Sequence, residues 1–391
     1  LVETLRHLAD SGLLQSDADG GWRTPFDAST ADYSELPIPA TVREAVLARV
    51  RALGAPVQRL LEAASLLSDR FEASLLVDAT PLLLEEVLGA LAHAGAAHLV
   101  REDAAGFHFV HDLLRQCVAD SLGATRRRAL HARLAATLAR SGAEPALVAA
   151  QWEASGDRAT AADWRRQAGE RALRAHALAQ ALDHFESAIA DAPDSPQASA
   201  LLQRCAEVHA MQGNRAEADA ALVRAIVAAR ADRDSALAAQ IERARLWSLD
   251  QAERTLAWLD AIAPDLAEAP AARRGRALWV RATALWALGR VAHSEALLHD
   301  AIRQLEGLPG SRDDLARLLD ALARSAIRRG DLDAALAHIE RAIGVLETID
   351  APEALAQALG LQGAVLVNLA RRSQGEAALV RAKALAARTG C

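Results

Sequence analysis

The chain has 391 residues, of which 52% are apolar and 24% are charged, a composition typical of a folded protein rather than a disordered one. Its length exceeds that of a single hydrophobic core, so we expect two or more domains. The 44 basic and 51 acidic residues give a net charge of −7, which excludes an overall basic field for nucleic acid or anionic lipid.

The first segment, LVETLRHLADSGLL at residues 1–14, has the leucine spacing of a helix. It begins without methionine and shows no charged region followed by an apolar one, so no signal peptide is predicted. Residues 16–39 are rich in Asp, Gly, Ser, Thr and Pro and are predicted to be a loop. We expect residues 1–37 to be the end of an upstream helical subdomain and a linker, which would make the chain a fragment.

Residues 38–123 combine helices with one hairpin. The spacing of apolar residues predicts helices at 41–53, 55–67, 81–95 and 111–122. Two short β-type runs, AHLVRED and GFHFVHD, are separated by Ala104, Ala105 and Gly106 and predict the hairpin. Three helices followed by a hairpin is the order of a winged-helix domain, which we predict for this segment.

The charge of this segment argues against DNA binding. Between Ile38 and Leu122 there are seven basic and eleven acidic residues, and the third helix carries Glu85 and Glu86 without an arginine. Phosphate contacts supply most of the non-specific affinity for DNA, so this surface would be repelled. We expect the domain to be regulatory, with no direct contact between this chain and nucleic acid.

Residues 124–391 are predicted to be helical throughout and contain an internal repeat. Six segments share a phase: 176–189, 213–226, 249–262, 289–302, 330–343 and 372–385. The thirteenth position of each is alanine: Ala188, Ala225, Ala261, Ala301, Ala342 and Ala384. Gly213, Gly289 and Gly330 open three of them as turn residues. We expect the alanines to allow paired helices to approach closely, and the pairs to stack into a superhelix.

The sequence contains no motif for catalysis or metal binding. Its only lysine is Lys383, and neither GxxxxGK[ST] nor GxGxxG occurs, so the chain has no nucleotide-binding P-loop of its own. Cys117, Cys205 and Cys391 are far apart and are expected to be incidental thiols. HExxH and GxSxG do not occur, and the nearest histidine sets lack a third ligand. We therefore predict neither an enzyme nor a metal site.

Four tryptophans are candidates for a ligand site. Trp279 and Trp286 are seven residues apart and share one helix face, and Trp247 and Trp258 come from the preceding repeat. They could line a ligand-binding groove. Indole rings at helical spacing in a stacked repeat also pack in the core, and the sequence leaves both interpretations open.

The GD, GN or GR turn, the small residue near the middle and the closing RAI resemble tetratricopeptide repeats (TPRs) over residues 160–391. The periods exceed the roughly 34 residues of the standard repeat. Arg254 and Ser294 stand where alanine is usual. The resemblance implies a TPR-like α-α superhelix with lengthened helices.

A second resemblance rests on segments that follow one another along the whole chain: LVETLRHLADSGLL, PATVREAVLARVRALGAPVQRLLEAASLLSDRFEASLL, FHFVHDLLRQCVADSL, RRRALHARLAATL and LVAAQWEASGDRATAADW. Together they resemble the regulatory half of STAND-type signalling ATPases, which include LuxR-like large activators and ATPases associated with cyclases. The resemblance implies that a P-loop core, which binds ATP or ADP, precedes Leu1.

The same resemblance implies two nucleotide-binding candidates, His111 and Arg115. In the family, a histidine at the end of the winged-helix hairpin contacts the ADP phosphate and holds the inactive state, and His111 with Asp112 stands at the matching place. A helix N-terminus also favours anions on physical grounds. The alternative is that Asp112 caps the helix, His111 packs against it and Arg115 is a surface residue.

Together these patterns predict a mainly α protein, with a winged-helix domain at 38–123 followed by a TPR-like superhelix at 124–391. We expect a non-catalytic, cytoplasmic segment of a STAND-type ATPase that senses a protein or small-molecule inducer on its repeats and contacts the upstream nucleotide-binding domain. The longest uncharged stretch, 355–370, is too short to span a membrane. The alternative function is a stand-alone TPR scaffold for protein–protein interaction.

Overall fold

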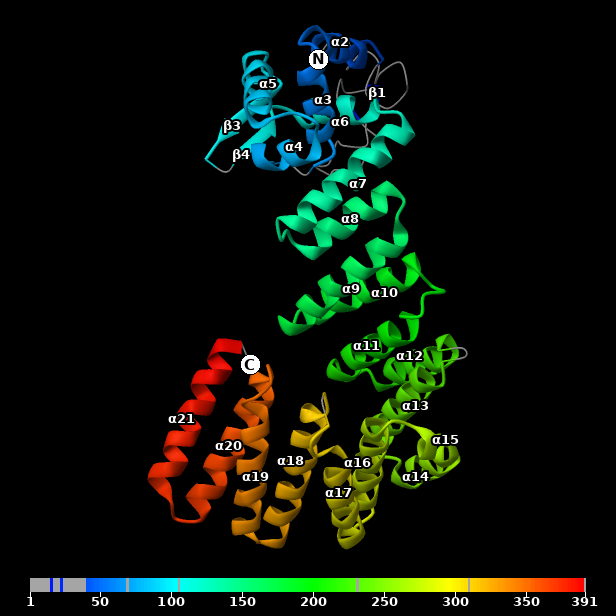
Figure 1. Cartoon of the computed structure of the whole chain (residues 1–391), viewed down its shortest axis with the longest axis vertical. Helices are drawn as coiled ribbons and strands as arrows, with labels where there is room; N and C mark the ends of the chain where they lie inside the picture. The colour runs from blue at the N-terminus through cyan, green and yellow to red at the C-terminus, as the bar shows by residue number, and fades with distance from the viewer. Residues whose placement is uncertain are drawn as a thin grey trace. The chain divides into compact units, whose positions relative to one another are not determined.

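The computed structural model describes residues 15–16, 22–23, 40–67, 70–104, 106–229, 232–308 and 310–389, most of which are helical (Figure 1). The chain forms two compact units, Leu1–Trp164 and Arg165–Cys391. Within the described ranges, no helix is long and apolar enough to cross a membrane. The helix predicted at 1–14 lies outside the described residues.

The first unit contains short strands as well as helices. The predicted loop at 16–39 begins with an antiparallel pair of two-residue strands, and most of the rest of it lies outside the described residues. The strands are β1 (Gln15–Ser16), β2 (Trp22–Arg23), β3 (Val100–Asp103) and β4 (Gly106–Phe109). The helices are α2 (Ala40–Ala52), α3 (Ala55–Ala64), α4 (Ala73–Ala79), α5 (Leu84–Ala96), α6 (Asp112–Asp120), α7 (Ala124–Arg140) and α8 (Pro145–Ser155).

The four helices and the hairpin expected at 38–123 are all present, and α4 is an additional element. With only seven residues, α4 is too short to show a helical period in the sequence. The core of this unit is built on leucines such as Leu60, Leu61 and Leu76, each 0% exposed. Burying one such side chain stabilises the fold by about 1.5–3 kcal/mol.

Phe71 adds a third extended segment to the β3–β4 hairpin. Its amide and carbonyl exchange two hydrogen bonds of 2.9 Å with Phe107. Gly106 has a φ of +119°, and a Cβ built on it would lie 2.8 Å from the Phe71 carbonyl oxygen. The close approach of the two segments therefore depends on glycine at this position.

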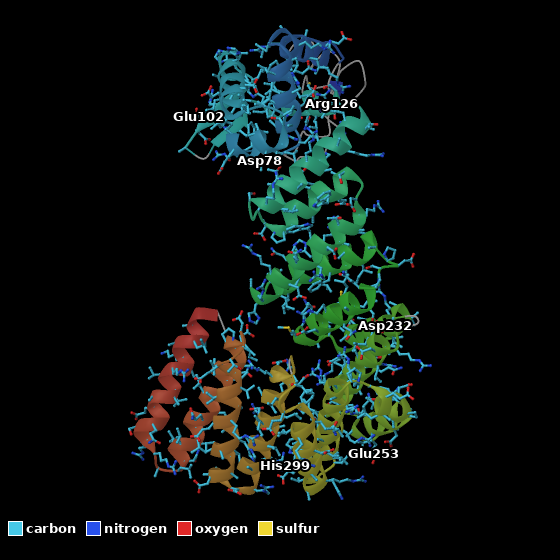
Figure 2. All side chains as sticks on the ribbon, in the orientation of Figure 1. Asp78, Glu102, Arg126, Asp232, Glu253 and His299 are labelled. Carbon is cyan, nitrogen blue, oxygen red and sulfur yellow. The ribbon has the colours of Figure 1, made fainter. Side chains whose placement is uncertain are left out.

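Helices α7 and α8, at the end of the first unit, are bound to its α3 and to the residues that follow α3. Arg126 at the start of α7, whose side chain is labelled in Figure 2, forms an ion pair with the buried carboxylate of Glu62 in α3. The Gln151 side chain of α8 donates to the Leu66 carbonyl at 2.9 Å. The compact unit thus extends beyond Gly123, where the winged-helix segment is predicted to end.

The second unit is a row of helical hairpins, which begins with the second half of α9 (Arg158–Arg174). The other helices are α10 (Leu178–Asp191), α11 (Ala198–Met211), α12 (Arg215–Ala228), α13 (Arg233–Trp247), α14 (Ala252–Ala261), α15 (Ala263–Glu268), α16 (Ala271–Ala287), α17 (Val291–Leu305), α18 (Arg312–Arg329), α19 (Leu332–Leu346), α20 (Pro352–Asn368) and α21 (Arg372–Thr389). Consecutive helices pack in pairs, and α15 is an extra short helix after the third pair. The predicted stack of helical hairpins is confirmed.

Five of the turns inside these hairpins have one geometry. A residue with φ between 53° and 81° stands in each: His176, Gly213, Gly289, Gly330 and Ala370. The amide after it donates to the carbonyl five residues earlier, as Asn214 does to His209 at 2.8 Å. This closure satisfies the free carbonyls at the end of the first helix and reverses the chain.

The recurring alanines mark helix contacts in four of the six copies. Ala188, Ala225, Ala301 and Ala342 are at most 2% exposed. In the last copy the turn is at Ala370, two residues before the predicted start. The thirteenth residue is therefore Ala382, which packs against the core, while Ala384 is exposed. The predicted contact at Ala384 is wrong because the turn comes two residues earlier than predicted.

The third copy is out of phase by one residue. Its second helix has Gln251 as N-cap, the role that Asn214 has in the preceding copy. The thirteenth position is then Ile262, where α14 ends, and Ala261 is exposed. The predicted contact at Ala261 is therefore also wrong.

A more regular marker is the fourth residue after the N-cap of the second helix in the first five hairpins. The residues there are at most 2% exposed: Ala181, Ala218, Thr255, Ser294 and Ala335. The hydroxyls of Thr255 and Ser294 donate to the Ala244 and Ala282 carbonyls of the paired helices, at 3.3 and 2.7 Å. Thr255, and not Arg254, therefore stands where alanine is usual, and both buried hydroxyls are satisfied.

Glycines on the first helix of three pairs bring the second helix close. A Cβ on each would lie 2.6–2.7 Å from a side chain of the second helix: Gly169 from Phe185, Gly275 from Leu305 and Gly363 from Leu379. Real Cβ atoms essentially never show contacts this short, so any larger residue would force the facing side chain to move.

Candidate functional site

The N-terminus of α6 holds the first candidate residue. His111 is its N-cap, in extended conformation with φ −140° and ψ 138°, and its exposed side chain makes no capping hydrogen bond. The first amides of a helix and its dipole attract anions, so an exposed imidazole here could meet a phosphate. The adjacent Asp112 carboxylate, in contrast, would repel an anion.

Arg115, the second candidate, already has partners within the unit. Its Nε donates to Asp112 at 2.6 Å and its Nη1 donates to the Ser65 carbonyl at 3.2 Å. Gln116 donates to the other Asp112 oxygen at 2.7 Å. Arg115 therefore connects α6 to the residues that follow α3, and Asp112 accepts from side chains one turn later.

The four candidate tryptophans do not form one group. Trp247 donates from its indole nitrogen to Asp219 at 2.9 Å, and the same carboxylate accepts from Arg243 at 2.7 Å. Trp258 has the guanidinium carbons of Arg243 and Arg254 at 4.9 and 4.6 Å from its ring centroid. These two indoles are thus engaged in a cluster between α12, α13 and α14.

Trp279 and Trp286, in contrast, line a groove of about 570 Å³ in the second unit. They lie on α16, and the groove continues over α18 and α20 with Ser294, Leu298 and Ala342 also lining it. Both indoles are half-buried. Trp279 also packs against two core clusters, so its ring is shared between core and groove.

A row of charges on α18 forms another wall of this groove. Asp313, Arg317, Asp320 and Arg324 follow each other at intervals of four, three and four residues and therefore lie on one helix face. They form two ion pairs within the helix, Arg317 with Asp313 and Arg324 with Asp320, each at 2.7 Å.

The groove is joined to a distant part of the same unit at Glu353. This residue lines the groove from the first turn of α20, and its Oε1 lies 3.1 Å from Nε2 of His176. His176 stands in the turn between α9 and α10, 177 residues earlier in the chain. The first and last hairpins of the unit therefore touch at the edge of the groove.

Beside the groove, Arg276 connects three successive hairpins. Its guanidinium binds Glu242 of α13 at 3.0 Å and Asp314 of α18, and it lies over the Trp279 ring at 4.7 Å. Burial alone would raise the pKa of Glu242, but the charges of Arg245 and Arg276 outweigh it and hold that pKa below its usual value. The network remains ionised at neutral pH.

Ion pairs of the same kind join neighbouring hairpins elsewhere in the unit, with the two partners one repeat apart in the sequence. The partners are 34 residues apart in four of them: Glu170 with Arg204, Glu242 with Arg276, Glu295 with Arg329, and Glu347 with Arg381. The interval equals the roughly 34 residues of a standard TPR although the turns are spaced more widely.

Sequence reasoning did not identify the α18 row, Glu353 or Arg276. The row could have been found, since acid and arginine alternate there at helical spacing in the printed sequence. The His176–Glu353 contact has no local signal. Among the described residues, no three His, Cys, Asp or Glu side chains are grouped so that they could hold a metal ion.

Comparison with known proteins finds similarity only at the level of structure. No family model and no curated protein matches the chain. The chain is similar to a signal transduction ATPase with numerous domains (STAND) protein with a tetratricopeptide repeat sensor from Pyrococcus horikoshii, with 12% identity and a TM-score of 0.58. The match covers 93% of this chain and 54% of that protein, so the chain spans about half its length.

Two further solved structures are less similar. A tetratricopeptide repeat protein from Parabacteroides merdae has 14% identity and a TM-score of 0.47, with 66% of this chain and 93% of that one covered. BtubC from P. vanneervenii has 17% identity and a TM-score of 0.42, with 57% and 92% covered. At such identities the likeness to the Pyrococcus protein concerns the fold alone, which in this chain is mainly α with a TPR-like superhelix.

Proposed function

We propose that this chain is the regulatory and sensing part of a STAND-type signalling ATPase, of the kind found in LuxR-like activators or cyclase-associated ATPases. The observation that carries the proposal is the structural match to a STAND protein with a TPR sensor, which extends over 93% of the chain. The nucleotide-binding core would be supplied by residues outside this sequence, since no P-loop motif occurs in it.

In this proposal the first unit contains the winged helix. Its helices α3, α4 and α5 precede the β3–β4 hairpin, and Phe71 pairs with the hairpin between α3 and α4. Glu85 and Glu86 in the first turn of α5 give the third helix an acidic start. A helix so charged suits contact with another domain better than contact with DNA.

The second unit would be the sensor. A ligand can shift a protein between two states only if it binds them with different affinities. The groove is lined by α16, α18 and α20, which belong to three hairpins, and Arg276 beside it joins α16 to α18 and to one further helix, α13. A ligand in the groove would therefore favour one curvature of the superhelix over others.

His111 fits a contact with a bound nucleotide better than Arg115 does. The imidazole is exposed at a helix N-terminus, whereas the Arg115 guanidinium is held by Asp112 and by the Ser65 carbonyl. We assign His111 to the ADP phosphate and Arg115 to positioning the start of α6. The bound nucleotide would supply the negative phosphate charge that His111 contacts. The protein would act as a signalling protein in the cytoplasm.

The test is retention of ADP by the protein expressed from its full open reading frame. We expect His111→Ala to weaken ADP retention at least tenfold and His93→Ala, an exposed histidine on α5, to leave it unchanged. Equal ADP retention by both variants would show that His111 does not contact the bound nucleotide. A reading frame without a P-loop would instead favour the repeat scaffold for protein–protein interaction.

A further inference from the structure

The chemistry of the groove on α16, α18 and α20 indicates which class of molecule it takes. Its volume of about 570 Å³ lies in the range of small-molecule sites, roughly 300–1,000 Å³. One edge is formed by Glu353, which His176 contacts from the turn between α9 and α10. A peptide laid along the inner surface past this edge would have to displace that contact, and a small molecule would not.

The formal charges that line the groove already have partners. Asp313 and Arg317 are 2.7 Å apart, Asp320 and Arg324 are 2.7 Å apart, and Glu353 faces the imidazole of His176 at 3.1 Å. A ligand with a net charge would have to break one of these pairs or leave its own charge without a partner. These pairs are about half exposed, so breaking one costs little, but an uncharged ligand needs no counter-charge from the groove at all.

The wall on α16 favours a flat apolar molecule. Trp279 and Trp286 are two helical turns apart, and each has a guanidinium over its ring, Arg276 at 4.7 Å and Arg328 at 4.0 Å. Other walls include small side chains such as Ala321, which leave room beside the indoles. The guanidinium covers one face of each ring, so a planar apolar group would pack against the remaining indole surface, edge to face or offset.

We propose that this groove binds a flat, mainly apolar small molecule without net charge. The assignment rests on the sensing role proposed above and names the class of ligand for it. Occupancy would bring the ligand against Trp279, on which Arg276 is stacked, and so against the network that joins α13, α16 and α18.

Three fluorescent dyes of different charge test the proposal on this chain: neutral prodan, anionic anilinonaphthalene sulfonate and cationic thioflavin T. We expect prodan to saturate one site and to bind more tightly than either charged dye. Leu83, Leu84 and Leu88 on the first unit are 74%, 53% and 46% exposed and could also take up dye. All measurements are therefore repeated with Leu84→Ser, which should leave the prodan site intact.

Two groove variants and one control locate the site. Ala321→Trp fills the groove and Trp286→Leu removes part of its wall, and each should weaken prodan binding at least tenfold. Ala337→Trp, on the exposed face of α19, should not change it. Circular dichroism and thermal melting establish that each variant is folded. One groove variant adds volume and the other removes it, so the test remains valid if one of them fails to fold.

The other results overturn the proposal. Prodan binding that both groove variants leave unchanged would show that the site lies elsewhere. Tighter groove binding of a charged dye would refute the uncharged class, and displacement of prodan by an amphipathic leucine–lysine helical peptide would indicate a peptide site. These measurements involve neither nucleotide nor His111, so their failure is distinct from failure of the ADP test.

Discussion

Replacement of Gly275 by alanine tests how closely the paired helices of the second unit approach. A Cβ at this position would meet three carbons of the Leu305 side chain at 2.7, 2.7 and 2.9 Å. Leu305 is 0% exposed and belongs to a core cluster, so it has little room to move. Overpacking of this kind costs about 1–3 kcal/mol.

Alanine also has an intrinsic advantage over glycine of about 1 kcal/mol inside a helix. The matched control is Gly360→Ala in the middle of α20, where a Cβ would meet nothing within 4 Å. We expect the control to stabilise the unit by about 1 kcal/mol. Gly275→Ala should then be about 1–3 kcal/mol less stable than the control.

Urea unfolding followed by circular dichroism measures the difference. Because repeat arrays can unfold in parts, hydrogen exchange of the α16 and α17 amides gives the local value. In a Leu305→Ala background the obstacle is gone, and Gly275→Ala should become stabilising. If Gly275→Ala stabilises the wild-type chain as much as Gly360→Ala does, the close approach of α16 and α17 is refuted.

Three further predictions concern other parts of the chain. Since the pKa of Glu242 is lower in the folded than in the unfolded state, its stabilising contribution is present above about pH 4.5 and is lost as the pH falls. Acid titrations should therefore show a smaller loss of unfolding free energy in Glu242→Gln, and equal losses would contradict this assignment. Burial raises the pKa of the Cys205 thiol to about 12, so mass spectrometry should find it unmodified by iodoacetamide until urea is added. Gly106→Ala should lower the stability of the first unit by about 1–3 kcal/mol in thermal melts, whereas Gly89→Ala, with open space around it, should not.

The hairpin repeat could be predicted from the sequence because each copy must bury the same small residues at the same step. The errors at Ala261 and Ala384 have a common origin. The alanine near the end of the second helix keeps the predicted spacing only where the turn before that helix stands in the same phase. In the last copy the turn residue with positive φ is Ala370, which carries no glycine signal in the sequence. In the third copy the N-cap of α14 is Gln251, one residue later than the predicted phase requires.

The groove was only half predictable. The seven-residue spacing of Trp279 and Trp286 placed them on one face of α16, where they do line it. Trp247 and Trp258 come from the neighbouring repeat, but contacts with Asp219, Arg243 and Arg254 hold them in a separate cluster. Such partners come from other helices, and no local pattern in the sequence reveals them.

The bridge formed by Arg276 limits how this array can be shortened or lengthened in evolution. Excision of the hairpin α16–α17 would remove the guanidinium and leave the Glu242 and Asp314 carboxylates without their common counterion. Glu242 would then keep its pair with Arg245, but Asp314 would lose its ion pair with Arg276. Whole-repeat deletion, usually the simplest edit to a solenoid, is therefore disfavoured here unless a neighbouring residue acquires a compensating positive charge.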